Sequence, residues 1–197
     1  MDGIKMVNVK IVEEPITKLP KYGQIPISFE VRSVFDVQLV DGGLQGFRLS
    51  ERKIDPPWVK DYDAFKDQGP TRWAKRWDIS NWAIISAFQE SRHIGGCVIA
   101  YDTPGVDKLE GRQDIAALWD LRVEPHFRRE GIGGRLVEAA IVWARKHKCR
   151  LLKVETQNIN VPACRLYTKH GFVLGAVNRY AYRELPDEVE LIWCREL

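Results

Sequence analysis

A glycine-rich turn between a strand-like and a helix-like segment limits the folds that this chain can adopt. Residues 123–136 read Val-Glu-Pro-His-Phe-Arg-Arg-Glu-Gly-Ile-Gly-Gly-Arg-Leu. Three glycines are a costly way to open a helix, at about 1 kcal/mol each relative to alanine, which disfavours an ordinary flexible loop. Without Cβ atoms, Gly131, Gly133 and Gly134 let backbone N–H groups approach a ligand closely, at the partially positive start of a helix. The turn predicts a cradle for an anion such as a diphosphate.

The segments that flank this turn alternate between strand and helix periodicity. The apolar pattern indicates a strand over Ile115–Val123, a helix over Gly131–Lys148, a strand over Leu151–Thr156 and a helix over Pro162–His170. A dinucleotide-binding loop is the more specific alternative interpretation of the glycine turn. Such a loop needs G-x-G-x-x-G directly after a strand, whereas an arginine precedes the glycines here. The order predicts an α/β domain with a mixed sheet.

The rest of the chain reads mostly as short strands. Alternating apolar residues indicate them at Met6–Val12, Ser28–Val40, Phe47–Arg52, Trp82–Phe88, His93–Tyr101, Phe172–Tyr182 and Glu188–Arg195. Asp41-Gly42-Gly43 predicts a hairpin turn. Three prolines exclude a regular long helix over Pro15–Pro26, residues 54–63 read as irregular, and Thr71–Trp77 as a short helix.

Composition excludes several classes of protein. With 197 residues, 45% hydrophobic and 29% charged, the chain suits one compact domain over residues 1–197. No apolar run reaches the length of a membrane span, and Met1–Lys10 lacks the pattern of a signal peptide, so we expect a cytoplasmic protein without a membrane partner. A net charge of +3, and a basic segment Arg145–Arg150 without interleaved aromatic residues, argue against a nucleic-acid partner.

The cysteines and histidines suggest neither a disulfide framework nor a metal site. The four cysteines, none in a C-x-x-C pair, lie in apolar stretches at Cys97, Cys149, Cys164 and Cys194. Free buried thiols are the simplest interpretation. The four histidines offer no ligand spacing beside them, and we expect no metal.

Two motifs together resemble the GNAT superfamily of acetyltransferases. The first is the strand end Leu121-x-Val123-x-Pro125 followed by R-x-x-G-x-G from Arg128 to Gly133. The second, about thirty residues later, is N-x-x-A-x-x-L-Y-x-x-x-G-F, which runs from Asn160 to Phe172. The resemblance covers residues 115–172 as an acetyl-CoA-binding core. It implies a mixed, mostly antiparallel central sheet that splays at the cofactor site and is flanked by helices. The prolines of this chain, in contrast, predict an irregular segment over residues 1–27 that includes the first strand.

Within that superfamily the chain looks most like the streptothricin (nourseothricin) acetyltransferases. The matching segments are Ser33–Val37, Ile54–Pro57, Trp119–Leu121 and Val154–Asn160. Many of these relatives have a full first helix where this chain has Pro15–Pro26. The resemblance implies acetyl-CoA as donor and a primary amine of a small molecule as acceptor, with antibiotic resistance as the outcome. Aminoglycosides, polyamines and peptide N-termini stay open as acceptors, as do a non-catalytic acetyl-CoA sensor and assembly as a homodimer.

The resemblance also assigns residues to the donor. Backbone groups of Leu121 and Val123 would bond the pantetheine amides, and an N–H near Val123 would polarise the thioester carbonyl. The pyrophosphate would lie over Arg128–Arg135, and Asn160 would cap the second helix and bond the cofactor. The full expected donor set is Leu121, Arg122, Val123, Arg128, Arg129, Gly131, Ile132, Gly133, Gly134, Arg135 and Asn160.

Three residues are candidates for the chemistry. An alkylammonium has a pKa near ~10, so a base must help to remove its proton, and Asp120 or Glu155, on the two strands beside the splay, could do so. Either carboxylate could instead be satisfied by a structural partner or bind the substrate ammonium. Tyr167 is the expected general acid for the leaving thiolate. Acidic and aromatic residues that could recognise a polycationic amine are Asp55, Trp58, Asp61, Tyr62 and Asp63.

Overall fold

A twisted seven-stranded sheet forms the centre of the molecule, in a computed structural model that describes residues 8–65 and 69–197. The strand order is β1-β4-β5-β6-β7-β9-β8, and only β6 and β7 run parallel. The strands are Val9–Glu14 (β1), Ala83–Gln89 (β4), Arg92–Tyr101 (β5), Ile115–Val123 (β6), Leu151–Gln157 (β7), Val173–Asn178 (β8) and Glu190–Glu196 (β9). The predicted mixed, mostly antiparallel sheet is confirmed. Of the predicted first strand, Met6 and Val7 lie outside the described residues.

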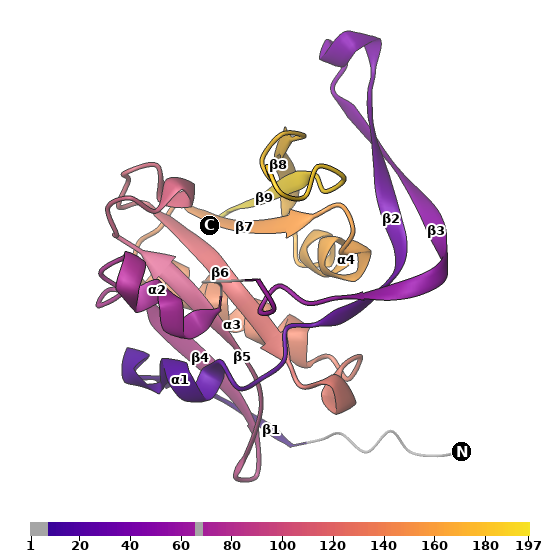
Figure 1. Ribbon diagram of the computed structural model, residues 1–197. Coiled ribbons are helices and arrows are strands. Elements are labelled where there is room, and N and C mark those ends of the chain that lie inside the picture. The colour runs from indigo at the N-terminus through magenta and orange to yellow at the C-terminus, as the bar shows by residue number, and fades with distance from the viewer. Residues whose placement is uncertain (1–7, 66–68) are drawn as a thin grey trace.

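Helices cover both faces of this sheet and give it two apolar cores (Figure 1). On one face lie α1 (Leu19–Tyr22) and α2 (Pro70–Arg76), which pack Tyr22 and Trp73 against β4, β5 and β6. On the other face lie α3 (Ile132–Lys146) and α4 (Val161–Lys169). The described residues also form four short 3-10 helices, at Ile16–Lys18, Asp41–Gly43, Asp107–Leu109 and Pro125–Phe127. In the part of the chain described, no helix is long and apolar enough to cross a membrane.

A separate two-stranded ribbon rises from the body beyond α4 (Figure 1). It pairs β2 (Phe29–Leu39) with β3 (Phe47–Lys60), as the hairpin signal predicts. The expectation of an irregular stretch over residues 54–63 is wrong for most of its length, because β3 continues to Lys60. The irregular sequence forms a bulge inside the strand. Val31 faces Trp58 but Ser33 faces Lys53, so residues 54–57 bulge opposite Arg32, and regular pairing resumes at Trp58.

Candidate functional site

A gap opens in the sheet where β6 and β7 stop pairing. The parallel ladder runs only from Ile115 and Leu151 to Leu118 and Val154, although both strands continue beyond it. At the same point β6 carries a bulge, since Ile99 faces Leu118 and Val98 faces Asp120, which leaves Trp119 as the extra residue. A bulge bends its strand and increases the local twist, and here it turns β6 away from β7. The expected splay is present.

Backbone groups of β6 face this gap. The Glu124 N–H donates to the Ile94 carbonyl at 2.9 Å. Because the bonding direction alternates along an antiparallel strand, Leu121 and Val123 direct their N–H and C=O groups toward the gap instead. The Val123 carbonyl accepts from Arg128 Nε at 2.9 Å. The Val123 N–H and both groups of Leu121 therefore remain for an extended arm lying in the gap like an added strand.

The three glycines of the cradle have three different roles. Gly131 caps α3 with a φ of 82°, a left-handed conformation that side chains rarely adopt. A Cβ on Gly134 would lie 2.9 Å from His170 Nε2, so this glycine lets α3 pack on the end of α4. A Cβ on Gly133 would make ordinary contact with Leu166 at 3.4 Å. All three line the cavity described below, whereas Ile132, also expected at the donor, is buried in the core.

The arginines of the loop differ in their contacts, although both Arg128 and Arg129 line the cavity described below. Arg128 donates to the carbonyls of Val123, Ser28 (2.7 Å) and Pro26 (3.1 Å), and burial lowers its pKa. Arg128 thus fastens the loop to the N-terminal segment. Arg129 lines the cavity, whereas Arg135 donates to the Val9 carbonyl at 2.6 Å and does not line it.

Two further cations line the cavity from α4, namely Arg165 and Lys169. They lie four residues apart, which places them on one face of the helix. That spacing is visible in the sequence, but on its own it does not distinguish a ligand-facing pair from solvated charges.

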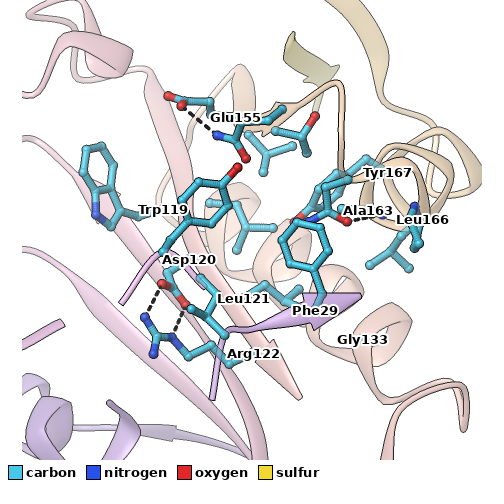
Figure 2. A pocket seen from close by; sticks show the side chains of 18 of the residues that line it. Phe29, Trp119, Asp120, Leu121, Arg122, Gly133, Glu155, Ala163, Leu166 and Tyr167 are labelled. Carbon is cyan, nitrogen blue, oxygen red and sulfur yellow. Dashed lines mark hydrogen bonds and ion pairs between the residues drawn. The ribbon is translucent and has the colours of Figure 1, made fainter. Parts of the chain in front are cut away.

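One cavity of about 1300 Å³ joins the cradle to the gap. Its walls come from residues 26–29, the segment after β3, β6, β7, α4 and the loop between β8 and β9. Figure 2 shows Trp119 and Tyr167 on opposite sides of this cavity, with Leu121 and Phe29 between them and Glu155 at one end. A single connected space of this kind can hold a long donor and an acceptor together.

Asp120 is engaged in a buried ionic network. Its carboxylate accepts a hydrogen bond from the Tyr22 hydroxyl and two from Arg122, at Nε (2.9 Å) and Nη2 (3.0 Å). Arg122 also bonds Asp63 and the Ile25 carbonyl, and its side chain is 1% exposed. The dashed bonds in Figure 2 show the Asp120 carboxylate turned toward Arg122. The Arg122 side chain, expected near the donor, serves this network.

Glu155 lies one residue past Val154, the last residue of β7 that pairs with β6, and it lines the cavity. Burial raises its pKa above the ordinary value, while Lys108 and Tyr182 oppose that rise. The Tyr182 hydroxyl donates to Glu155 Oε1 at 2.5 Å, and Lys108 Nζ lies 3.1 Å from Oε2. A carboxylate with a raised pKa inside a cavity has the properties of a proton acceptor.

Asn160 caps the start of α4, and Tyr167 lies in the last turn of that helix. Burial raises the pKa of the Tyr167 phenol, which keeps it protonated at neutral pH, and its ring contacts Phe172. Among the described residues, no side chain or backbone group bonds the Tyr167 hydroxyl, so it is free to serve a ligand in the cavity that it lines. Asn160 Oδ1 accepts from the Ala163 N–H at 3.2 Å, which is the predicted cap.

The expected acidic and aromatic wall is only partly assembled. Tyr62 and Asp63 line the cavity, but Asp55, Trp58 and Asp61 do not. Tyr62 donates to Glu188 at 2.6 Å, and Asp63 pairs with Arg122. The actual wall adds residues that sequence reasoning did not assign to the site: Phe29, Trp73, Lys108, Trp119 and Tyr182. Trp119 stands in the segment Trp119–Leu121 that carries the resemblance, whereas the other four lie far apart in the sequence and in no common motif, so no local signal identifies them.

No three of the described His, Cys, Asp and Glu side chains gather as a metal ion would require. The described cysteines are free thiols, with Cys97, Cys149 and Cys164 buried.

Comparison with known proteins gives concordant matches. Residues 50–172 match the model of the acetyltransferase (GNAT) family. A streptothricin acetyltransferase of Escherichia coli is 32% identical over 168 residues, which cover 84% of this chain and 83% of that protein.

Two solved structures share the fold along nearly the whole chain. One is a nourseothricin acetyltransferase, with a TM-score of 0.73 and 22% identity, covering 95% of this chain and 98% of that one. The other is a Bacillus anthracis protein described as a streptothricin acetyltransferase, in complex with acetyl coenzyme A. It has a TM-score of 0.72 and 24% identity, and covers 98% and 99% of the two chains.

Proposed function

Because this chain belongs to the acetyltransferase (GNAT) family, we propose that it transfers the acetyl group of acetyl-CoA to a primary amine of a streptothricin-type antibiotic. The observation that carries the proposal is the single cavity that connects the glycine cradle, the gap between β6 and β7, Tyr167 and Glu155. Donor and acceptor can meet there, with a proton acceptor and a proton donor beside them.

The donor half of the cavity fits acetyl-CoA in shape and charge. The unpaired backbone groups of Leu121 and Val123 suit the amides of the pantetheine arm. Gly131, Gly133 and the start of α3 suit the pyrophosphate, and Arg129 adds positive charge. Further cations that could meet the nucleotide phosphates are Arg165 and Lys169.

The chemistry assigns one proton acceptor and one proton donor. Glu155 takes a proton from the acceptor ammonium, and the freed electron pair on nitrogen forms the bond to the thioester carbon. As the carbon–sulfur bond breaks, its electrons go to sulfur and Tyr167 donates a proton to the thiolate. The nitrogen then loses its second proton, which restores the phenol, so that transfer to one ammonium releases one proton in total. We propose Glu155 rather than Asp120 for the first step, because the Asp120 side chain is 6% exposed and held by Tyr22 and Arg122, whereas the Glu155 side chain is 30% exposed in the cavity.

The acceptor half of the cavity suits a cation. Trp119 is held by ring contacts with Trp73, Trp77 and Trp82, with centroids 5.1–6.4 Å away, so it presents a fixed indole to the cavity. An aromatic face and a carboxylate together stabilise alkylammonium groups. The β-lysine chain of streptothricin carries such groups, and the E. coli relative bears the name of that activity. Acetylation would then underlie resistance to the antibiotic. Cytoplasmic location, one domain over residues 1–197 and a homodimer stay predictions.

A panel of acceptors tests the proposal. Purified protein with acetyl-CoA is given streptothricin, an aminoglycoside, spermidine or a peptide with a free N-terminus, and free thiol and product mass are measured. We expect streptothricin to give the highest kcat/KM and a product one acetyl group heavier. Turnover of another amine at a higher kcat/KM would replace the acceptor. Acetyl-CoA binding without turnover of any amine would indicate a sensor.

A further inference from the structure

Both oxygens of the Glu155 carboxylate are held by residues that approach from other parts of the chain. Oε1 accepts from the Tyr182 hydroxyl (2.5 Å) and from Gln157 Nε2 (3.3 Å), and Gln157 Nε2 also donates to the Tyr182 oxygen at 2.9 Å. Oε2 faces Lys108 Nζ at 3.1 Å. A carboxylate offers about four acceptor positions, so roughly one, on Oε2, is left for a further donor.

Lys108 is fully occupied by carboxylates. Its ammonium, with a side chain 16% exposed, also reaches Glu190 Oε1 and Asp107 Oδ2, each at 2.8 Å. An ammonium has three donors, and three carboxylates use them. Although burial acts to lower its pKa, these carboxylates raise the Lys108 pKa above its ordinary value, so the group stays charged. Lys108 therefore cannot itself act as a base or nucleophile at neutral pH.

We propose that Lys108 and Tyr182 are positioning residues, which keep the Glu155 carboxylate ionised and hold its free position toward the acceptor amine. The inference rests on the proposed function. Lys108 approaches from the loop before β6 and Tyr182 from the loop before β9, so two separate loops hold the carboxylate beside the gap between β6 and β7. Without them, a half-buried carboxylate in this cavity would lose part of its charge.

The direction of the pH effect follows from the groups that face Glu155. Burial and the neighbouring Glu190 carboxylate raise the Glu155 pKa, whereas the Lys108 charge and the Tyr182 hydrogen bond lower it. The Tyr62 phenol also interacts with Glu155 and Tyr182, and its pKa is raised by burial and by Glu188, so it is neutral at the pH of the assay. Lys153, Arg183 and Glu184 line the same cavity, and Asp107 and Glu190 contact Lys108. Removing Lys108 or the Tyr182 hydroxyl takes away one of the two effects that lower the Glu155 pKa, so the pKa rises. The base then protonates at a higher pH, and activity begins to fall earlier as the pH is lowered.

The test is the pH dependence of kcat/KM for acetylation of streptothricin by the intact protein. In Lys108→Met and in Tyr182→Phe we expect the acid limb of the profile to move up by roughly one pH unit, which is about a tenfold loss of kcat/KM on that limb. Lys108→Arg should restore most of the wild-type limb because it keeps the charge. The acceptor amine is the same throughout, so a moved limb belongs to the enzyme.

Lys153→Met is the matched control. Lys153 lines the same cavity and lies on β7, the strand that carries Glu155, but its ammonium pairs with Glu110 instead of Glu155. Its acid limb should stay at the wild-type position. Circular dichroism and thermal unfolding check that each variant is folded. If Lys108→Met does not fold, the acid limb of Tyr182→Phe alone tests the positioning role.

The outcomes separate this inference from the proposed function. Wild-type acid limbs in both Lys108→Met and Tyr182→Phe, or an equal shift in Lys153→Met, would overturn the positioning role. Glu155→Gln tests the proposed function on which this inference rests. Full kcat/KM at every pH in that variant would show that Glu155 is not the base, and the positioning role would fall with it. A large loss in Glu155→Gln beside unmoved limbs in the other variants would leave the proposed function intact and refute only this inference.

Discussion

Replacing Asp120 by asparagine should weaken the fold far more than the chemistry. Asparagine keeps the shape of the side chain but removes the charge that faces Arg122, and its amide N–H groups point at guanidinium donors. Arg122 is 1% exposed and Asp120 is 6% exposed, so water cannot replace the lost partner. The variant therefore leaves a buried charge half-compensated.

The contacts set the size of the effect. Removing one partner of a buried ion pair typically costs about 3–5 kcal/mol of the free energy of unfolding. Arg122 keeps its bonds to Asp63 and to the Ile25 carbonyl, which places the expected loss nearer to 2–3 kcal/mol. For a chain of this length that corresponds to a fall of about 5–10 °C in Tm.

Urea unfolding and steady-state kinetics on the same preparations provide the assay. Asp63→Asn is the control, because Asp63 also bonds Arg122 but is 31% exposed, and we expect it to lose about 1 kcal/mol. In Asp120→Asn the kcat/KM for streptothricin, measured below the unfolding transition, should stay within a few-fold of wild type. An unchanged urea midpoint would refute the structural role of Asp120. A stable fold with a hundredfold loss of turnover would in addition make Asp120 a candidate for the base.

Two further predictions concern the donor half of the site. Tyr167→Phe keeps the ring contact with Phe172 and removes the proton donor, so kcat in steady-state assays should fall by roughly 10²–10³-fold. The affinity for acetyl-CoA and the Tm should stay unchanged. A wild-type kcat would show that the phenol has a structural role only. Gly133→Val adds a side chain at the cradle where the nearest atoms lie in ordinary contact, so the protein should fold but bind acetyl-CoA at least tenfold more weakly by calorimetry; normal affinity in a folded variant would remove the cradle.

The sequence determined the elements that carry local signals. The glycine turn, β6, the amphipathic α3 and the capped α4 follow from periodicity and capping, because neighbouring residues alone produce those patterns. The donor half of the site could therefore be assigned from motifs. The acceptor half could not, since Lys108 and Tyr182 reach Glu155 from segments that are distant in the sequence and that only the fold brings together.

Tertiary structure decided which face of the sheet Asp120 occupies. Strict alternation along β6 would place Asp120 on the same side as Leu118, facing α3. The bulge at Trp119 adds one residue, which reverses the alternation and turns Asp120 to the α1 face beside Tyr22 and Arg122. A bulge arises from the register between two strands, and register depends on the packing of whole faces. For that reason the residue types of β6 could suggest a carboxylate, and only the folded sheet could show that the Asp120 side chain is 6% exposed beside Arg122 while the Glu155 side chain is 30% exposed in the cavity.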